Sequence, residues 1–103
     1  MEAIRLYSGS AASTGEKASV FIPNTMVATN NRNNTGHVQM VVTSGAGTPA
    51  VKIQGSADGT NWIDIATGVN TTTGFHIAVF PHMRANITTA AVSATNIDVF
   101  LII

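Results

Sequence analysis

The sequence predicts a small all-β domain, an antiparallel β-sandwich or jelly-roll-like barrel of about eight short strands with little or no helix. Three observations lead to this prediction. Apolar residues recur at every second position in several short runs, no segment shows helical periodicity, and the intervening stretches are rich in Gly, Asn and Thr. With 103 residues, 45% of them apolar, the chain can form one core, so we predict a single domain over residues 1–103.

The clearest element is a β-hairpin over residues 51–65. Two alternating runs flank Asp58-Gly59, where glycine can adopt the positive φ that a tight reversal needs. One face of the expected hairpin is apolar and carries Val51, Ile53, Ile63 and Ile65. The opposite face is polar and carries Lys52, Gln54 and Asp64. Trp62 is out of phase with its apolar neighbours, so we expect it either on the outer face beside the turn or over the end of the core.

Six further strands follow from the same alternation. We expect them at residues 4–7, 18–22, 37–43, 75–79, 83–87 and 96–103. Polar connectors rich in small residues are expected between them, including residues 8–15 and 66–74. The last strand is apolar on both faces and therefore needs cover on both. Either it is central in its sheet or a neighbouring subunit covers it.

One connector is rich in asparagine. It contains Asn30, Asn31, Arg32, Asn33 and Asn34. Asparagine side chains compete with backbone hydrogen bonds and tolerate left-handed conformations, so we expect a loop. Two interpretations stay open: a solvated connector, or a loop that reaches a partner, because connections longer than about 12 residues are uncommon without a function.

The chain has no formal net charge, and 10% of its residues are charged, compared with about 25% in an average globular protein. Such surfaces associate readily, which favours a permanent assembly; a monomer kept soluble by Asn, Thr and Ser is the alternative. The five Lys and Arg residues are scattered, so no nucleic-acid partner is expected. Neither a signal peptide nor a run long enough to span a bilayer is recognised, so no membrane partner is expected.

Residue types that carry catalysis are few and dispersed, and the chain has no cysteine. No paired carboxylates, nucleophile elbow or phosphate-binding loop can be recognised. We therefore predict a protein that is not an enzyme, with no catalytic residue, cofactor or metal site. His76 and His82, on either side of a proline turn, match no standard zinc spacing. Trp62 beside Asn61 and Asp64 leaves a sugar-stacking platform open as an alternative.

The hairpin 51–65, residues 82–88 and the closing strand 97–101 carry a family resemblance. Their sequences are VKIQGSADGTNWIDI, HMRANIT and IDVFL. They resemble small β-sandwich structural proteins of tailed bacteriophages, in which a V-x-L-Q-G-S-x-D-G-T-N-W hairpin recurs with a Y-x-R-x-x-V-T strand and a short hydrophobic C-terminal strand. The hairpin is also similar to the S-x-D-G-x-x-W segment of discoidin-type, galactose-binding-like modules. Those modules are longer and have a cysteine pair, and His82 stands where a tyrosine would be expected.

The phage resemblance implies a virion structural protein, a capsid decoration (cement) protein that assembles in the host cytoplasm and binds the major capsid protein on the outer surface of the head. A tail or head–tail structural protein is the nearest variant, and a carbohydrate-binding sandwich module is the alternative. Cement proteins hold neighbouring capsomers together, so we expect a homo-oligomer, a trimer. The expected contact residues are Asn30, Asn31, Arg32, Asn33 and Asn34 in the loop, Trp62 beside the hairpin turn, and Val99, Phe100, Leu101 and Ile102 in the final strand.

Overall fold

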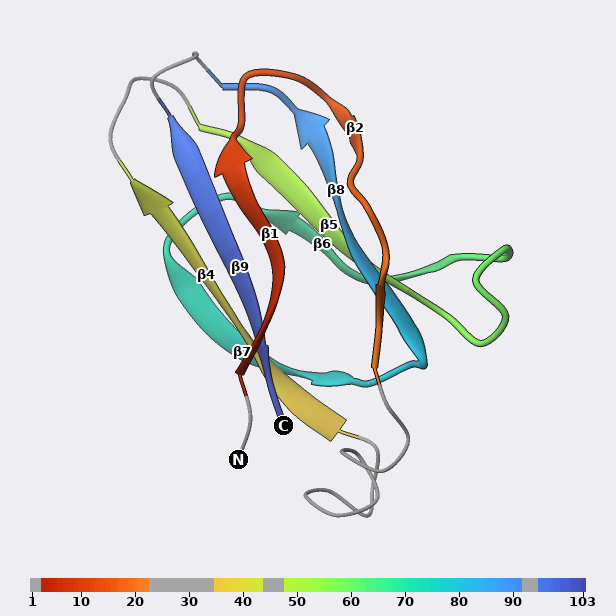
Figure 1. Ribbon diagram of the computed structural model, residues 1–103. Coiled ribbons are helices and arrows are strands. Elements are labelled where there is room, and N and C mark those ends of the chain that lie inside the picture. The colour runs from red at the N-terminus through yellow and green to blue at the C-terminus, as the bar shows by residue number, and fades with distance from the viewer. Residues whose placement is uncertain (1–2, 23–34, 44–47, 92–94) are drawn as a thin grey trace.

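A computed structural model describes residues 3–22, 35–43, 48–91 and 95–103. Within these residues the chain forms nine β-strands and no helix. The strands are β1 (Ala3–Ser10), β2 (Gly15–Glu16), β3 (Val20–Phe21), β4 (Thr35–Thr43), β5 (Ala50–Ser56), β6 (Ile63–Val69), β7 (Thr73–Ala78), β8 (His82–Thr89) and β9 (Asn96–Ile102) (Figure 1).

The strands form two antiparallel sheets that pack face to face (Figure 1). The first sheet has the order β1-β9-β4-β7, and the second has the order β2-β8-β5-β6, with β3 also paired to β8. Because β2 and β3 pair with successive parts of β8, they act as one interrupted strand. Two four-stranded sheets connected in this alternating order make a jelly roll. The predicted all-β sandwich of jelly-roll type is confirmed.

The core lies between the sheets and is built from alternate residues of each strand, as the sequence pattern predicts. The side chains without exposed surface include Val38, Met40, Val51, Ile53, Met83, Ala85, Ile87, Ile97, Val99 and Leu101. Strand β9 lies between β1 and β4, where Leu101 is in register with Ile4 on one side and Val38 on the other. The final strand is therefore central in its sheet, as the first of the two expected arrangements has it.

Strand boundaries at the polar edges differ from those that the sequence predicts. Strand β1 continues to Ser10, and β2 begins at Gly15, although residues 8–15 were expected to form a turn. Strand β6 continues to Val69 and β7 begins at Thr73, so a tight reversal replaces most of the expected connector. The prediction failed because edge strands are held by backbone hydrogen bonds, and solvent-facing Ser, Thr and Gly give no alternation to recognise.

The second strand of the hairpin also departs from the predicted pattern. Ile63 was expected to face the core but is 53% exposed. The inner side of its partner Gly55 is occupied instead by Ile65 and Phe80, since a Cβ at position 55 would lie 2.6 Å from a carbon atom of each. Register shifts in the β5–β6 ladder allow Ile65 to take this place.

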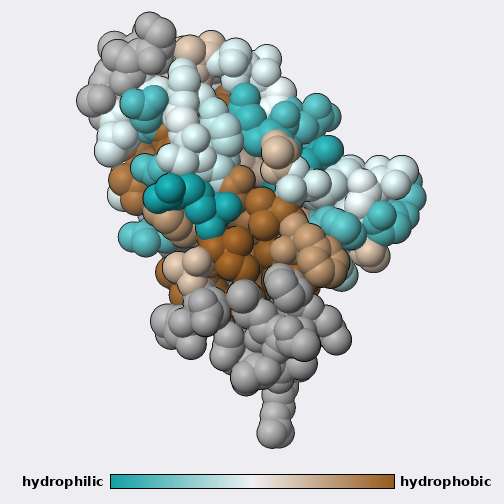
Figure 2. Space-filling view, in the orientation of Figure 1, coloured by the Kyte–Doolittle hydropathy of each residue, from teal (hydrophilic) through white to brown (hydrophobic). Residues whose placement is uncertain are grey.

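Figure 2 shows hydrophobic surface at the opening between the front edges of the two sheets. Strands β1 and β3 form these edges. On these two strands Ile4 and Val20 are half-buried, and Phe21, which follows Val20 on β3, is 61% exposed. The edges of the sandwich thus keep apolar surface exposed.

Candidate interaction surfaces

The turn of the β5–β6 hairpin projects from the sandwich and is held by one serine and one aspartate (Figure 1). Ser56 Oγ accepts hydrogen bonds from the N–H groups of Asp58 and Gly59, at 3.3 and 2.9 Å. Asp58 Oδ1 accepts hydrogen bonds from the N–H groups of Thr60 and Asn61, both at 2.8 Å. Asn61 Nδ2 donates to Asp58 Oδ2 at 2.8 Å. Gly59 has a φ of 79°, the positive value that the sequence predicts for this turn.

These hydrogen bonds should make the turn resistant to acid. The N–H groups of Asn61 and Thr60, followed by the side chains of Asn61 and Ser56, hold the pKa of Asp58 well below its usual range. Because the native pKa is lower than the unfolded value of about 3.9, ionised Asp58 stabilises the turn above that pH, and this contribution is lost as the pH falls through the native pKa. We expect the NMR amide shifts of Thr60 and Asn61 to stay constant from pH 7 to about pH 4.

Their acid transition should lie below the usual aspartate range and should disappear in Asp58→Asn, which keeps an acceptor oxygen but has no charge to titrate. A midpoint at or above the usual aspartate value would show that the hydrogen bonds do not persist in solution.

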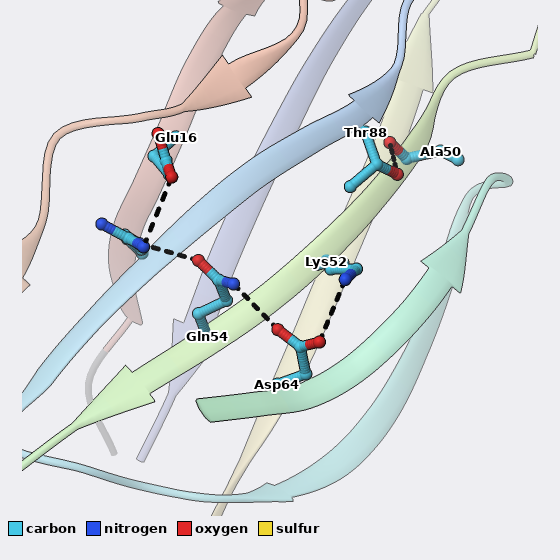
Figure 3. A network of polar contacts seen from close by, with 7 residues as sticks. Glu16, Ala50, Lys52, Gln54, Asp64 and Thr88 are labelled. Atoms are coloured by element: carbon cyan, nitrogen blue, oxygen red, sulfur yellow. Dashed lines mark hydrogen bonds and ion pairs between the residues drawn. The ribbon is translucent and has the colours of Figure 1, made fainter. Parts of the chain in front are cut away.

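A chain of polar side chains crosses the outer face of the second sheet (Figure 3). Arg84 Nη2 lies 3.8 Å from Glu16 Oε1, and Arg84 Nε donates to Gln54 Oε1 at 2.8 Å. Gln54 Nε2 donates to Asp64 Oδ1 at 2.8 Å, and Lys52 Nζ pairs with Asp64 Oδ2 at 3.0 Å. The hydrogen bond from Gln54 and then that from Lys52 lower the pKa of Asp64. The 8% exposed Gln54 therefore joins strands β8 and β6 through both ends of its amide.

Trp62 covers this network. The Arg84 guanidinium lies 4.0 Å from the centroid of the indole ring, and Trp62 is half-buried. Trp62 thus lies on the outer face beside the turn, the first of its two expected positions. The polar groups that would orient a sugar on Trp62 already have partners inside the protein. Asn61 donates a hydrogen bond to Asp58, and Asp64 accepts one from Gln54. These contacts favour a structural role for Trp62.

The two sequence motifs of the family resemblance therefore meet in space. Arg84, from the motif on β8, bonds Gln54 and stacks on Trp62, both from the hairpin motif. The serine, aspartate and glycine of the hairpin motif build the turn, and Gly55 allows close packing of larger side chains above it. The motif residues are accounted for by the fold, so sites of partner contact have to be sought elsewhere on the surface.

On the outer face of the first sheet lie alternate side chains of the final strand, β9. Val99 and Leu101, expected to contact a partner, have no exposed surface and lie in the core of their own chain, so this expectation is corrected. Phe100 and Ile102 alternate with them, face outward and are half-buried. The Arg5 guanidinium lies 5.3 Å from the centroid of the Phe100 ring. Of the four final-strand residues expected at a contact, Phe100 and Ile102 are therefore the two that face outward.

The histidines pair in a way that sequence spacing did not suggest. His76 lies on β7 in the first sheet and His82 on β8 in the second, where the His82 ring is 5.4 Å from that of Phe21. His76 instead lies directly opposite His37 of β4, with ring centroids 5.0 Å apart and an interplanar angle of 76°. The two residues are far apart in the sequence, so only the strand pairing reveals that they are neighbours.

The asparagine-rich tract, which comprises Asn30, Asn31, Arg32, Asn33 and Asn34, lies outside the described residues. In the part of the chain that the structure describes, no group of three or more His, Cys, Asp or Glu side chains is arranged to hold a metal ion. The described residues also include no helix long and apolar enough to cross a membrane.

Neither the models of known protein families nor the curated proteins include a match to this chain. The fold, the two outer sheet faces and the sequence motifs are therefore the basis for assigning a function.

Proposed function

We propose that this protein is a non-enzymatic structural component of a bacteriophage virion, a capsid decoration protein that assembles in the host cytoplasm and binds the major capsid protein on the outer surface of the head. One observation carries the proposal. Residues 51–65 and 82–88, which resemble motifs of small phage structural proteins, form a single unit through contacts of Gln54, Arg84 and Trp62. Residues that resemble one family and also depend on one another for packing support a shared architecture more strongly than scattered similarities do.

The jelly-roll fold is compatible with this role. Jelly rolls occur in viral capsid proteins and in lectins, so the likeness of fold alone does not identify a function. Between these two uses, the contacts of Trp62 favour the structural one, since Arg84 stacks on the indole ring and Asn61 is engaged by Asp58. A carbohydrate-binding module therefore remains the alternative against which the proposal is tested.

Self-association as a trimer would use the outer face of the first sheet. The central strand of this sheet presents Phe100 and Ile102, while Arg5 lies against the Phe100 ring and Asp98 accepts a hydrogen bond from Ser8 Oγ at 2.5 Å. Both charged groups thus have contacts within the sheet. An apolar centre surrounded by polar groups is the usual composition of a specific interface.

We expect light scattering to give the mass of a trimer over a range of protein concentrations. The double variant Phe100→Asp/Ile102→Asp should give the mass of a monomer, because charges at the centre of an interface lose their hydration when it forms. Thr67→Asp places one carboxylate at an exposed position on β6, in the other sheet, and should leave the trimer intact. Circular dichroism should show that both variants keep the β-sheet fold.

Cosedimentation with head shells of the same phage tests the capsid partner directly. The wild-type protein should sediment with shells, in saturable amounts, and bind no sugar on a glycan array. Failure to bind shells, together with glycan binding that is lost in Trp62→Ala, would replace the virion role with the carbohydrate-binding alternative.

A further inference from the structure

The pair formed by His37 and His76 lies at the margin of the face proposed for self-association, since His37 is in register with Ile102, and that proposal gives the two imidazoles no role. The two residues lie directly opposite each other on β4 and β7, and both project from the outer face of the first sheet. His76 is exposed and His37 is half-buried, so solvent reaches the pair. Strand β7 is at the edge of the sheet, which leaves the outer side of His76 open.

The distance between the rings suits a shared metal ion. Two imidazoles bound to one tetrahedral ion through bonds of about 2.0–2.1 Å hold their ring centroids about 5 Å apart. The centroids of His37 and His76 are 5.0 Å apart in the structure. The present T-shaped arrangement differs from a chelating one in the rotation of the side chains, and the exposed side chain of His76 can rotate on a picosecond to nanosecond timescale. The backbone is therefore already in place for chelation.

Among the described residues, the side chains next to the pair on this face carry no charge. The residues that flank the pair on this face, along β4 and β7 and across to β9, are Thr35, Gln39, Gly74, Ala78 and Ile102. Gly74 leaves space for the His37 ring in its present position, because a Cβ there would lie 2.5 Å from His37 Nε2. No cationic side chain among these neighbours would repel a metal ion.

We propose that His37 and His76 form a two-histidine binding site for one divalent transition-metal ion of the kind that prefers imidazole, such as Zn²⁺ or Ni²⁺. Each histidine supplies one ring nitrogen, and water or another ligand fills the remaining positions. The ion would tie the edge strand β7 to β4. Because a metal that binds the native state stabilises it, occupancy of this site would strengthen the exposed edge of the first sheet.

Calorimetric titration of the tag-free, full-length protein with Zn²⁺ and with Ni²⁺ tests the site. We expect saturable binding of one equivalent, a rise in the melting temperature that a chelator reverses, and joint NMR shifts of the His37 and His76 ring protons. His37→Gln and His76→Gln should each weaken binding by at least about tenfold, since a single imidazole cannot chelate. His82→Gln is the matched control and should bind as the wild type does.

The proposal is wrong if neither metal binds saturably, or if His37→Gln and His76→Gln bind with the wild-type affinity. Equal loss in His82→Gln would also exclude it, because that residue lies on the other sheet. The proposed capsid role can fail independently of these outcomes, since shell binding and metal binding are measured on separate samples with separate variants.

Discussion

Replacement of Val99 by aspartate should leave the protein unfolded at room temperature. Val99 has no exposed surface and lies in register between Tyr7 of β1 and Met40 of β4. Burying an unpaired carboxylate at this position costs several kcal/mol, and loss of the apolar side chain adds a packing cost. A domain of this size has a total stability of only about 5–15 kcal/mol. Circular dichroism and size-exclusion chromatography should show loss of the β-sheet signal and of the compact form.

Ile102→Asp on the same strand provides the matched control. Its side chain points to the outer face of the first sheet and is only half-buried, so the charge can remain hydrated and the chain should stay folded. Equal retention of structure in both variants would show that the two faces of β9 are not divided between core and surface as the structure has them.

Replacement of Arg84 by alanine should lower the free energy of unfolding by about 2–4 kcal/mol, through loss of the stacking contact and of a hydrogen bond to a buried acceptor. Gln54, 8% exposed, would lose the donor to its carbonyl oxygen, and Trp62 would lose the guanidinium at 4.0 Å from its ring. Among the described side chains, every buried nitrogen or oxygen atom has a hydrogen-bond partner. In this variant the carbonyl oxygen of Gln54 would be buried without one. Urea titration gives the value directly.

Lys52→Ala removes a member of the same network that is one-third exposed and should cost no more than about 1 kcal/mol, as surface ion pairs usually do. Arg84→Lys should restore the charge but only part of the stability, because an ammonium group lacks the planar, multiply donating geometry of guanidinium. If Arg84→Ala were no more destabilising than Lys52→Ala, the network would not depend on Arg84.

The inner faces of the strands could be predicted because burial imposes a strict period of two. Met83 and Ile87 alternate with Arg84 and Asn86, and the structure places the first pair in the core and the second pair outside it. The turn at Gly59 could be predicted for an equally local reason, since few residues tolerate a positive φ. The short strand β2 and the polar ends of β1, β6 and β7 escaped prediction, because pairing at sheet edges depends on backbone groups that every residue has.

The surface sites could be predicted only in part. All four residues from Val99 to Ile102 were predicted as contact residues, since a run that is apolar on both faces does not show which face is inside. The structure places Val99 and Leu101 in the core and Phe100 and Ile102 on the outer face. The pairing of His37 with His76 gave no signal at all. Contacts between strands far apart in the chain depend on register, and register is set by the assembled sheet.

By itself the sequence determined the fold class, the alternating faces of the main strands and the hairpin turn. The first two follow from the alternation of apolar and polar residues, and the turn follows from the backbone conformation of one glycine. Only the tertiary structure decided that the final strand is central, that Arg84 joins Gln54 to Trp62, and that His37 meets His76. These features depend on which strands become neighbours. That choice is made by the packing of the whole core, and no local stretch of the chain contains it.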